Sequence, residues 1–365
     1  MKEIKINKDI YTGPKIFLKR LHQTNKIPKN INICNPDNFS IKQARNKKDS
    51  DQVLIARLDG TYFYKFTIKE MIGFLGSRGY LKYKKDNLGE SIEPSRRLTK
   101  AINRALNNNI KWLISNSEGV IFQSQFSKNL VDKFLDTSNL QKFSIINNGV
   151  NLDEYNPSLN DHRWKEYYPN LLISASSYRP QKRLNDAIKL VNSLSKIYPK
   201  IHLHVLGNVN KAVKEELVSL DLSRSTFHGK ISLEDLPSFY SSCDLQLHLA
   251  LFDPCPNVVV EGLASGLPVV TPRLSGAYEL IQYQKDWSIE ENSEIDYYEN
   301  HRPWAFPSID LLSYEQKLIP LIENIDQNKE IARDIAERNL NIDYISSKYI
   351  YFINQVTGNL DEETT

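Results

Sequence analysis

Short apolar runs alternate with amphipathic stretches along most of this chain, and the alternation predicts its secondary structure. Seven runs have the length and sharp borders of buried strands, at residues 51–58, 119–124, 143–146, 170–176, 201–207, 245–251 and 267–271. Eight stretches have helical periodicity, at residues 15–22, 95–117, 127–135, 184–197, 233–240, 257–264, 311–325 and 329–354. Strands that alternate with helices favour doubly wound parallel sheets. We therefore predict an α/β protein with two Rossmann-like domains, separated by a polar linker at 157–169.

The stretch from residue 253 to residue 271 combines this pattern with chemistry. After the apolar run that ends at residue 251, two prolines stop the strand, and Asn257 is expected to cap the helix that follows. The amides of Asn257, Val258 and Val259 would then form an anion site at the helix N-terminus. Asp253 and Glu261 flank this site, and carboxylates accept hydrogen bonds from sugar hydroxyls. A nucleotide sugar carries both phosphates and hydroxyls, so it fits this stretch.

With seven residues between its two acids, this stretch resembles the signature of retaining glycosyltransferases of family 4, which have the GT-B fold. The resemblance implies that Asp253 contacts the donor sugar and Glu261 the ribose. It also implies that the amides of Asn257 and Val258 meet sugar and phosphate. The family usually has Glu at the first position, so Asp253 is one methylene shorter. The alternative is that Asp253 opens a turn and that Glu261 is a solvated helix residue.

A second motif, at the turn after residues 170–176, carries Arg179 and Lys182. Fixed cations beside a helix N-terminus suit a diphosphate. Relatives hold the donor phosphates with an Arg and a Lys of this turn, so the resemblance assigns that role to Arg179 and Lys182. Together with Asp253 they form the predicted catalytic set, although both cations could also be ordinary surface residues. The family implies no metal and no other cofactor.

Further donor contacts are implied by the resemblance alone. Gly229, Lys230 and Ile231 match the segment whose backbone reads the nucleotide base. Gly13 matches the glycine-rich loop that approaches the donor phosphates from the first domain, or it only marks the start of a helix. Glu279 belongs to a Gly-x-x-Glu turn near the donor.

In the first domain, Asp59 follows a predicted strand and is the candidate for contact with the acceptor, unless it only starts a turn with Gly60. No residue matches the first-domain His of the family. Two alternatives therefore stay open: a non-catalytic protein that binds nucleotide sugars or acts as a scaffold, and a nucleotide-sugar epimerase of the same architecture.

Three histidines lie in predicted strands. His202 and His204 share one face of their strand, and because a metal site would need a third ligand, we expect both to be packing or surface residues. His248 is expected to pack inward, near enough to Asp253 to touch the site.

Charge is distributed unevenly. Residues 1–111 hold 24 Lys and Arg against 10 Asp and Glu, a net +14, whereas the remainder carries −11. The basic part could contact the anionic face of a membrane or an acidic acceptor, or its lysines could serve solubility alone. No basic helix or aromatic pattern typical of nucleic-acid binding accompanies the charge. With three scattered cysteines and no apolar leader at the N-terminus, we expect a cytoplasmic protein, either free or peripheral on the cytoplasmic face of the membrane.

The resemblance sets the expected organisation and activity. Residues 1–160 would bind the acceptor and residues 161–340 the donor, while residues 341–365 would form a helix that crosses back to the first domain, and a tail. The activity would be retaining transfer of a sugar from a UDP- or GDP-sugar to a glycan or lipid-linked acceptor. Polysaccharide assembly at the cell surface is the setting that the family suggests.

Overall fold

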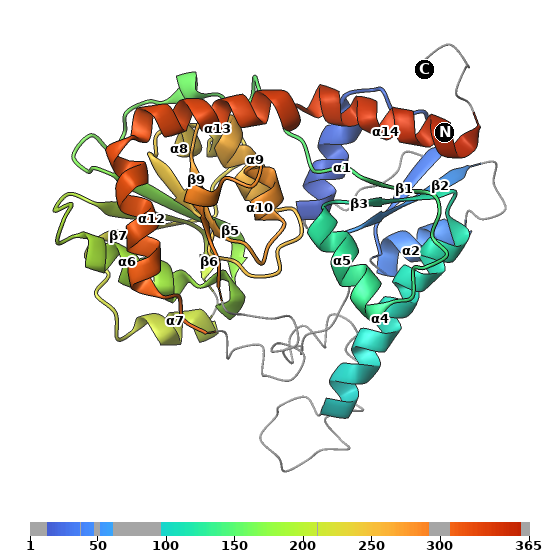
Figure 1. Ribbon diagram of the computed structural model, residues 1–365, viewed down its shortest axis with the longest axis horizontal. Helices are drawn as coiled ribbons and strands as arrows, with labels where there is room; N and C mark the ends of the chain where they lie inside the picture. The colour runs from blue at the N-terminus through green and yellow to red at the C-terminus, as the bar shows by residue number, and fades with distance from the viewer. Residues whose placement is uncertain are drawn as a thin grey trace.

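A computed structural model describes residues 13–36, 38–46, 52–60, 96–209, 211–291 and 307–358. These residues form two parallel β-sheets, each covered by helices on both faces (Figure 1). The predicted fold class, two parallel α/β domains, is confirmed. Two predictions lie partly outside the described residues, namely the turn that begins at Asp59 and the tail after residue 358.

The first sheet has four parallel strands in the order β1-β2-β3-β4. Its elements are α1 (Gly13–Gln23), β1 (Ile31–Cys34), α2 (Asn38–Asn46), β2 (Val53–Leu58), α4 (Arg96–Asn116), β3 (Gly119–Phe122), α5 (Gln125–Phe134) and β4 (Phe143–Ile145). The strand β1 and the helix α2 were not predicted. Helices α2, α4 and α5 pack on one face of this sheet, and α1 packs on the other.

The second sheet has six strands in the order β10-β9-β8-β5-β6-β7. Its elements begin with β5 (Asn170–Tyr178), α6 (Leu184–Leu194), β6 (His202–Val209), α7 (Lys211–Leu217), β7 (Ser225–Gly229), α8 (Leu236–Ser241) and β8 (Leu245–Leu247). They continue with α9 (Asn257–Ala264), β9 (Val269–Pro272), α10 (Ala277–Leu280), β10 (Ser288–Ile289), α12 (Leu311–Glu323) and α13 (Ile325–Asn339). One continuous hydrophobic core joins most of these strands and helices.

The chain returns to the first sheet through its last helix, α14 (Ile342–Thr357) (Figure 1). The helix predicted at residues 329–354 is in fact two helices, α13 and α14, because the backbone at Asn341 pairs with Val150. Val150 accepts a hydrogen bond from the amide of Ile342 (2.9 Å) and donates one to the carbonyl of Leu340 (2.9 Å). Tyr349 and its neighbours on α14 then pack on the face of the first sheet that α1 also covers.

A stack of aromatic and imidazole rings lies on the second sheet. The ring of His204 lies 3.7 Å from that of Trp164, and both His204 and His202 are buried, as expected for packing residues. The Nε2 atom of His204 is 3.1 Å from the amide oxygen of Asn170, and its Nδ1 atom is 3.1 Å from Nε2 of His228. Since the amide oxygen can only accept, His204 carries its proton on Nε2 and accepts at Nδ1. A second proton on His204 would have to sit on Nδ1, where it would face the N–H that His228 donates.

Acid is expected to destabilise the protein through this stack. Burial lowers the pKa of His204 to about 2 and also lowers those of His202 and His228. Because the unfolded chain binds protons below pH 6.5 while the folded stack does not, stability is intact above that pH and falls as the pH drops below it. His204 alone should cost about 2 kcal/mol by pH 5. Urea unfolding between pH 7 and pH 5 tests this, and His204→Gln should show a correspondingly shallower loss.

Candidate functional site

The strand order of the second sheet alone indicates where this sheet would bind a ligand. From β5 the chain proceeds outward to β6 and β7, then returns to β8 on the other side of β5. The carboxyl ends of β5 and β8 therefore flank a topological switch point, where parallel sheets bind ligands. The loops after these two strands meet there, since Nζ of Lys182 lies 2.6 Å from Oδ2 of Asp253. Two members of the predicted catalytic set are thus brought into contact.

The turn after β5 explains how Lys182 is placed. The amide of Lys182 bonds to the carbonyl of Arg179 (2.9 Å), which closes a short 3-10 turn (Pro180–Lys182). Arg183 then adopts a left-handed conformation (φ 54°) before α6 begins. The side chain of Lys182 is 26% exposed and points to the switch point, and Arg179 lies at the exposed start of the turn.

Arg183 has a structural role that the sequence did not reveal. Its side chain is 2% exposed and donates to both carboxylate oxygens of Glu291 (2.6 and 2.8 Å) and to the carbonyl of Pro307 (3.0 Å). Of the neighbouring cations, Lys182 therefore faces the switch point while Arg183 anchors the turn to the domain core.

Asp253 is held from several sides. Its backbone carbonyl accepts hydrogen bonds from the amide of Gly276 (2.8 Å) and from the hydroxyl of Ser275 (3.1 Å). A Cβ atom on Gly276 would lie 1.7 Å from the carbonyl oxygen of Pro254, so this close approach requires glycine. Burial alone would raise the pKa of Asp253, but Lys182 and His248 outweigh it and the pKa is lowered. Asp253 is therefore a carboxylate at neutral pH.

The N-terminus of α9 differs in detail from the prediction. Pro256 is the N-cap, and Asn257 is the first helical residue, with its side-chain oxygen accepting from Nδ2 of Asn148 in the first domain (2.8 Å). The predicted use of Val259 as an anion donor is wrong for this conformation, because its amide bonds to the carbonyl of Pro256 (3.0 Å). The amides of Asn257 and Val258 stay predicted phosphate or sugar contacts.

Glu261 lies within α9 and bonds to the first domain. Its Oε1 atom is 2.7 Å from Nη2 of Arg20 on α1, and both side chains are buried. Tyr240 donates to the other carboxylate oxygen (3.3 Å), and Arg20 also donates to the hydroxyl of Tyr155 (3.2 Å). Burial raises the pKa of Glu261, which Arg20 and Tyr240 only partly oppose. Arg20 was not a sequence candidate, because nothing in its local pattern marks it out from a surface arginine of a helix.

Glu279, on α10 of the second domain, also contacts the first domain. Its carboxylate accepts hydrogen bonds from the amides of Gln125 (2.7 Å) and Phe126 (2.6 Å), at the N-terminus of α5. A carboxylate at this end of a helix is stabilised by the unpaired amides and by the helix dipole. Burial raises its pKa while the two amides oppose the shift. In this structure Glu279 caps a helix of the first domain, and its contact with a donor stays a prediction.

The remaining first-domain candidates lie at the ends of their elements. Gly13 opens α1. Asp59 follows β2, and a Cβ on the next residue, Gly60, would lie 4.0 Å from the ring of Pro254. The predicted acceptor residue thus lies beside the loop that carries Asp253.

The predicted base-reading segment borders a cavity of about 510 Å³ at the carboxyl ends of β6 and β7. Gly229 lies in the left-handed region (φ 69°) with open space where a Cβ would be. Apolar side chains of β6, α7, β7 and the intervening loop line this cavity, namely Val209, Leu217, Val218, Leu220, Leu222 and Phe227. Lys230 is exposed, and Ile231 packs on the core. Three strand spacings of about 4.8 Å separate β7 from β8, a span that a nucleoside diphosphate can bridge.

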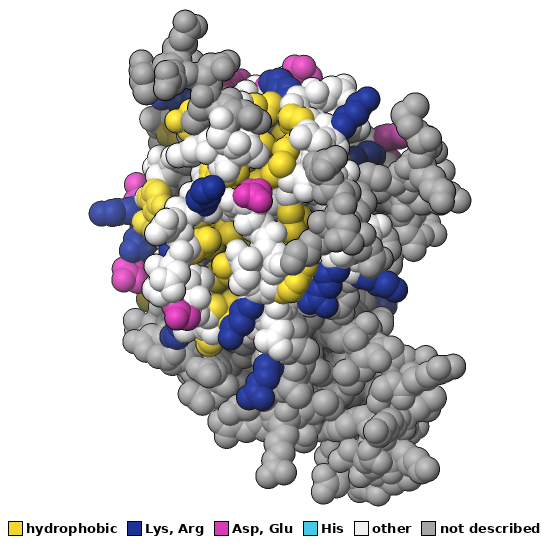
Figure 2. Space-filling view, turned by 90° about the vertical axis from the view of Figure 1, so that its right-hand side faces the viewer, with side chains coloured by type: hydrophobic (Ala, Val, Ile, Leu, Met, Phe, Trp, Pro, Cys, Tyr) yellow, Lys and Arg dark blue, Asp and Glu magenta, His cyan; other side chains and the backbone are white. Residues whose placement is uncertain are grey.

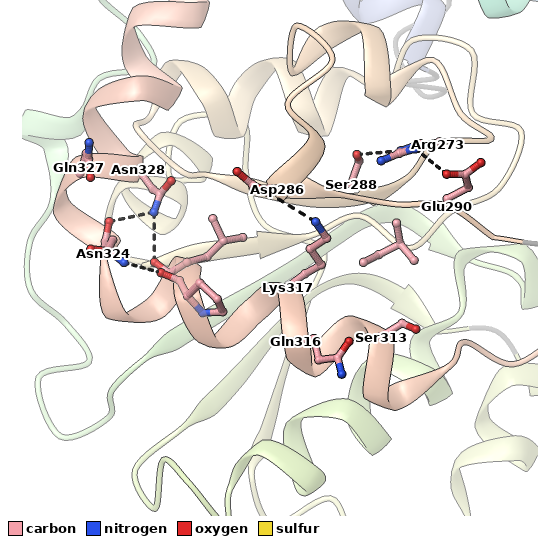
Figure 3. A pocket seen from close by; sticks show the side chains of 13 residues that line it. Arg273, Asp286, Ser288, Glu290, Ser313, Gln316, Lys317, Asn324, Gln327 and Asn328 are labelled. Atoms are coloured by element: carbon pink, nitrogen blue, oxygen red, sulfur yellow. Dashed lines mark hydrogen bonds and ion pairs between the residues drawn. The ribbon is translucent and has the colours of Figure 1, made fainter.

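A different cavity, of about 690 Å³, lies between the edge strand β10 and helices α12 and α13 (Figure 3). Its two cations are already neutralised, Arg273 by Glu290 (2.8 Å) and Lys317 by Asp286 (3.6 Å). It contains none of the predicted site residues. The chemistry therefore favours the switch point over this larger cavity.

The part of the chain described by the structure contains no group of three or more His, Cys, Asp or Glu residues that could hold a metal ion. Among the same residues, no helix is both long and apolar enough to traverse a bilayer.

Comparison with known proteins identifies the class of the second domain. Residues 161–301 match the model of the family Glycosyl transferases group 1, so this part of the chain is similar to domains of that family. An uncharacterized glycosyltransferase of Methanocaldococcus jannaschii is 27% identical over 175 residues, which are 47% of this chain and 44% of that protein. The match thus spans less than half the length of this curated relative.

Solved structures extend the similarity to the whole fold. HepE of Anabaena, in complex with UDP and glucose, has a TM-score of 0.59 at 16% identity, covering 93% of this chain and 82% of that one. Sucrose-phosphate synthase of Thermosynechococcus elongatus has a TM-score of 0.65 at 14% identity, covering 95% and 78%. The fold is therefore the two-domain GT-B arrangement.

Proposed function

We propose that this protein is a retaining glycosyltransferase of family 4. It would move a sugar from a UDP- or GDP-sugar to a glycan or lipid-linked acceptor during assembly of a cell-surface polysaccharide. The observation that carries the proposal is the 2.6 Å contact between Lys182 and Asp253 at the switch point of a glycosyl transferases group 1 domain. UDP and glucose bound to HepE, a protein of the same fold, support a nucleotide-sugar donor.

In this mechanism the bond between the sugar C1 atom and the phosphate oxygen breaks, and a bond from C1 to the acceptor oxygen forms on the same face. The acceptor proton passes to the leaving phosphate. Lys182 and Arg179 stabilise the negative charge that develops on that phosphate, which lowers the barrier without a metal ion. Asp253 accepts hydrogen bonds from the sugar hydroxyls and orients the reacting carbon. Asp59 lies on the acceptor side.

The nucleoside would extend from this point along the carboxyl ends of the strands. Gly229 to Ile231 would contact the base beside the 510 Å³ cavity, and Glu261 would bind the ribose. Because Arg20 holds Glu261 in this structure, the ribose hydroxyls would have to replace Arg20. That exchange requires the two domains to separate slightly before the donor is seated.

The cytoplasmic face of a membrane is the proposed location, with the basic first domain toward anionic lipid. Figure 2 shows Lys and Arg side chains on the described part of one face of the molecule, spread between Asp, Glu and hydrophobic groups. Mixed charges of this kind support a loose peripheral contact rather than a specific lipid site.

The test is incubation with a panel of UDP- and GDP-sugars, with and without glycan and lipid-linked acceptors. Release of nucleotide that depends on an acceptor supports transfer. Isomerisation of the sugar without an acceptor would favour an epimerase, and binding without turnover would favour a scaffold protein. Asp253→Ala is expected to reduce turnover chiefly, and Glu261→Ala to weaken nucleotide binding. Unchanged kinetics in both variants would remove the assignment of this site.

A further inference from the structure

His248 lies directly beneath the ion pair at the switch point. It follows β8, its backbone amide bonds to the carbonyl of Val270 (2.9 Å), and its side chain is 4% exposed. Its Nε2 atom is buried and has no hydrogen-bond partner among the described residues. Oδ2 of Asp253 lies 3.8 Å from this nitrogen, which is too far for a hydrogen bond. A buried imidazole nitrogen without a partner is costly, so its retention needs a reason.

The distances around Asp253 suggest a reason for the unpartnered nitrogen of His248. Oδ2 of Asp253 accepts a hydrogen bond from Lys182 at 2.6 Å. Nε2 of His248 is 3.8 Å from the same oxygen, about 1 Å longer than a hydrogen bond. If the ammonium of Lys182 turned toward a donor diphosphate, Asp253 would become a partly buried carboxylate without a cation. A small rotation of its carboxylate toward His248 would restore a hydrogen bond.

We propose that His248 is a positioning residue: it donates a hydrogen bond to the carboxylate of Asp253 in place of Lys182 when Lys182 binds the diphosphate of the donor. The inference rests on the proposed function for the identity of that diphosphate. Burial lowers the pKa of His248 to about 4, against the opposing effect of Asp253, so the imidazole is neutral at pH 7 and can donate a single N–H. Asp253 would then keep its orientation toward the sugar hydroxyls throughout the reaction, and Lys182 would be released without leaving an unpaired carboxylate behind.

The first test uses stability and needs no substrate. In Lys182→Met, Asp253 loses its cation permanently, so His248 should become its partner. His248→Leu should therefore lower the melting temperature more in the Lys182→Met background than in the wild-type protein. The same cycle with Lys189→Met, which removes a 40% exposed cation of α6, should be additive. Additive effects in the Lys182 cycle as well would overturn the proposal, whether or not the protein transfers sugar.

The second test uses turnover. Glutamine places an N–H donor near the position of Nε2, whereas leucine places none. We expect His248→Leu to lower kcat by about 10- to 100-fold, the range for a hydrogen bond to a charged group. UDP or GDP affinity should change less than about 3-fold, and His248→Gln should recover most of the rate. Equal loss of nucleotide affinity and rate in both variants would indicate a merely structural residue. Coupling in the stability cycle without any nucleotide-sugar binding would instead reject the proposed function and leave the exchange of partners at Asp253 standing.

Discussion

Lys182→Met is expected to lower the rate of sugar transfer by about 100- to 1,000-fold, the usual effect of removing one group that stabilises transition-state charge. The negative charge of the leaving diphosphate would develop at the switch point between the carboxyl ends of β5 and β8, within reach of the ammonium of Lys182. Methionine keeps most of the apolar stem and removes only the charge. Steady-state kinetics with the donor identified in the panel would measure kcat and KM separately. Because the cation would act mainly in the transition state, kcat should fall more than donor affinity.

Two further variants separate charge from shape at this position. Lys182→Arg keeps the cation and should retain a substantial share of the rate, although the longer planar group will not match the 2.6 Å contact with Asp253. Lys189→Met removes a cation from the following helix and should leave the rate unchanged. If Lys182→Met turned over as fast as the wild-type protein, the proposed phosphate role of this turn would be wrong.

The sequence could predict that Lys182 and Asp253 lie together because the information is local. Lys182 and Asp253 each follow a recognisable buried strand, and parallel strands bring their carboxyl ends to one edge of a sheet. The limits of α9 were also predicted because an apolar helix lies between proline and a terminal glycine. Only its cap was wrong by one residue, since Pro256 precedes Asn257.

The contacts between the domains could not be predicted in the same way. Arg20 and Glu261 are 241 residues apart, and nothing in the sequence around either residue indicates that the two will pair. Glu279 looks like part of a local turn, yet it caps α5, more than 150 residues earlier. Such pairings depend on how two separately folded sheets dock, and helical or strand periodicity holds no information about docking. The break between α13 and α14 has the same origin, because the pairing with Val150 is what ends the first helix.

Arg20→Met is expected to destabilise the protein by about 3–5 kcal/mol, the range for removing one partner of a buried ion pair. Glu261 is 5% exposed and sits between Arg20 and Tyr240, so without the guanidinium its charge would lack a cation. Urea unfolding at pH 7 measures the loss. A matched control is Arg338→Met, which breaks the exposed pair with Asp334 (74% and 49% exposed) and should change stability by less than about 1 kcal/mol.

The double variant Arg20→Met/Glu261→Gln decides the cause of that loss. If the cost arises from an uncompensated carboxylate, removing the charge of Glu261 should restore most of the stability, because burial of a neutral amide beside Tyr240 is far cheaper. If the double variant is as unstable as Arg20→Met, the loss arises instead from packing of the Arg20 stem between the domains. The same proteins bear on donor binding, since the ribose is proposed to displace Arg20 from Glu261. Arg20→Met, with Glu261 already released, should then bind UDP or GDP more tightly than the wild-type protein under conditions where both remain folded.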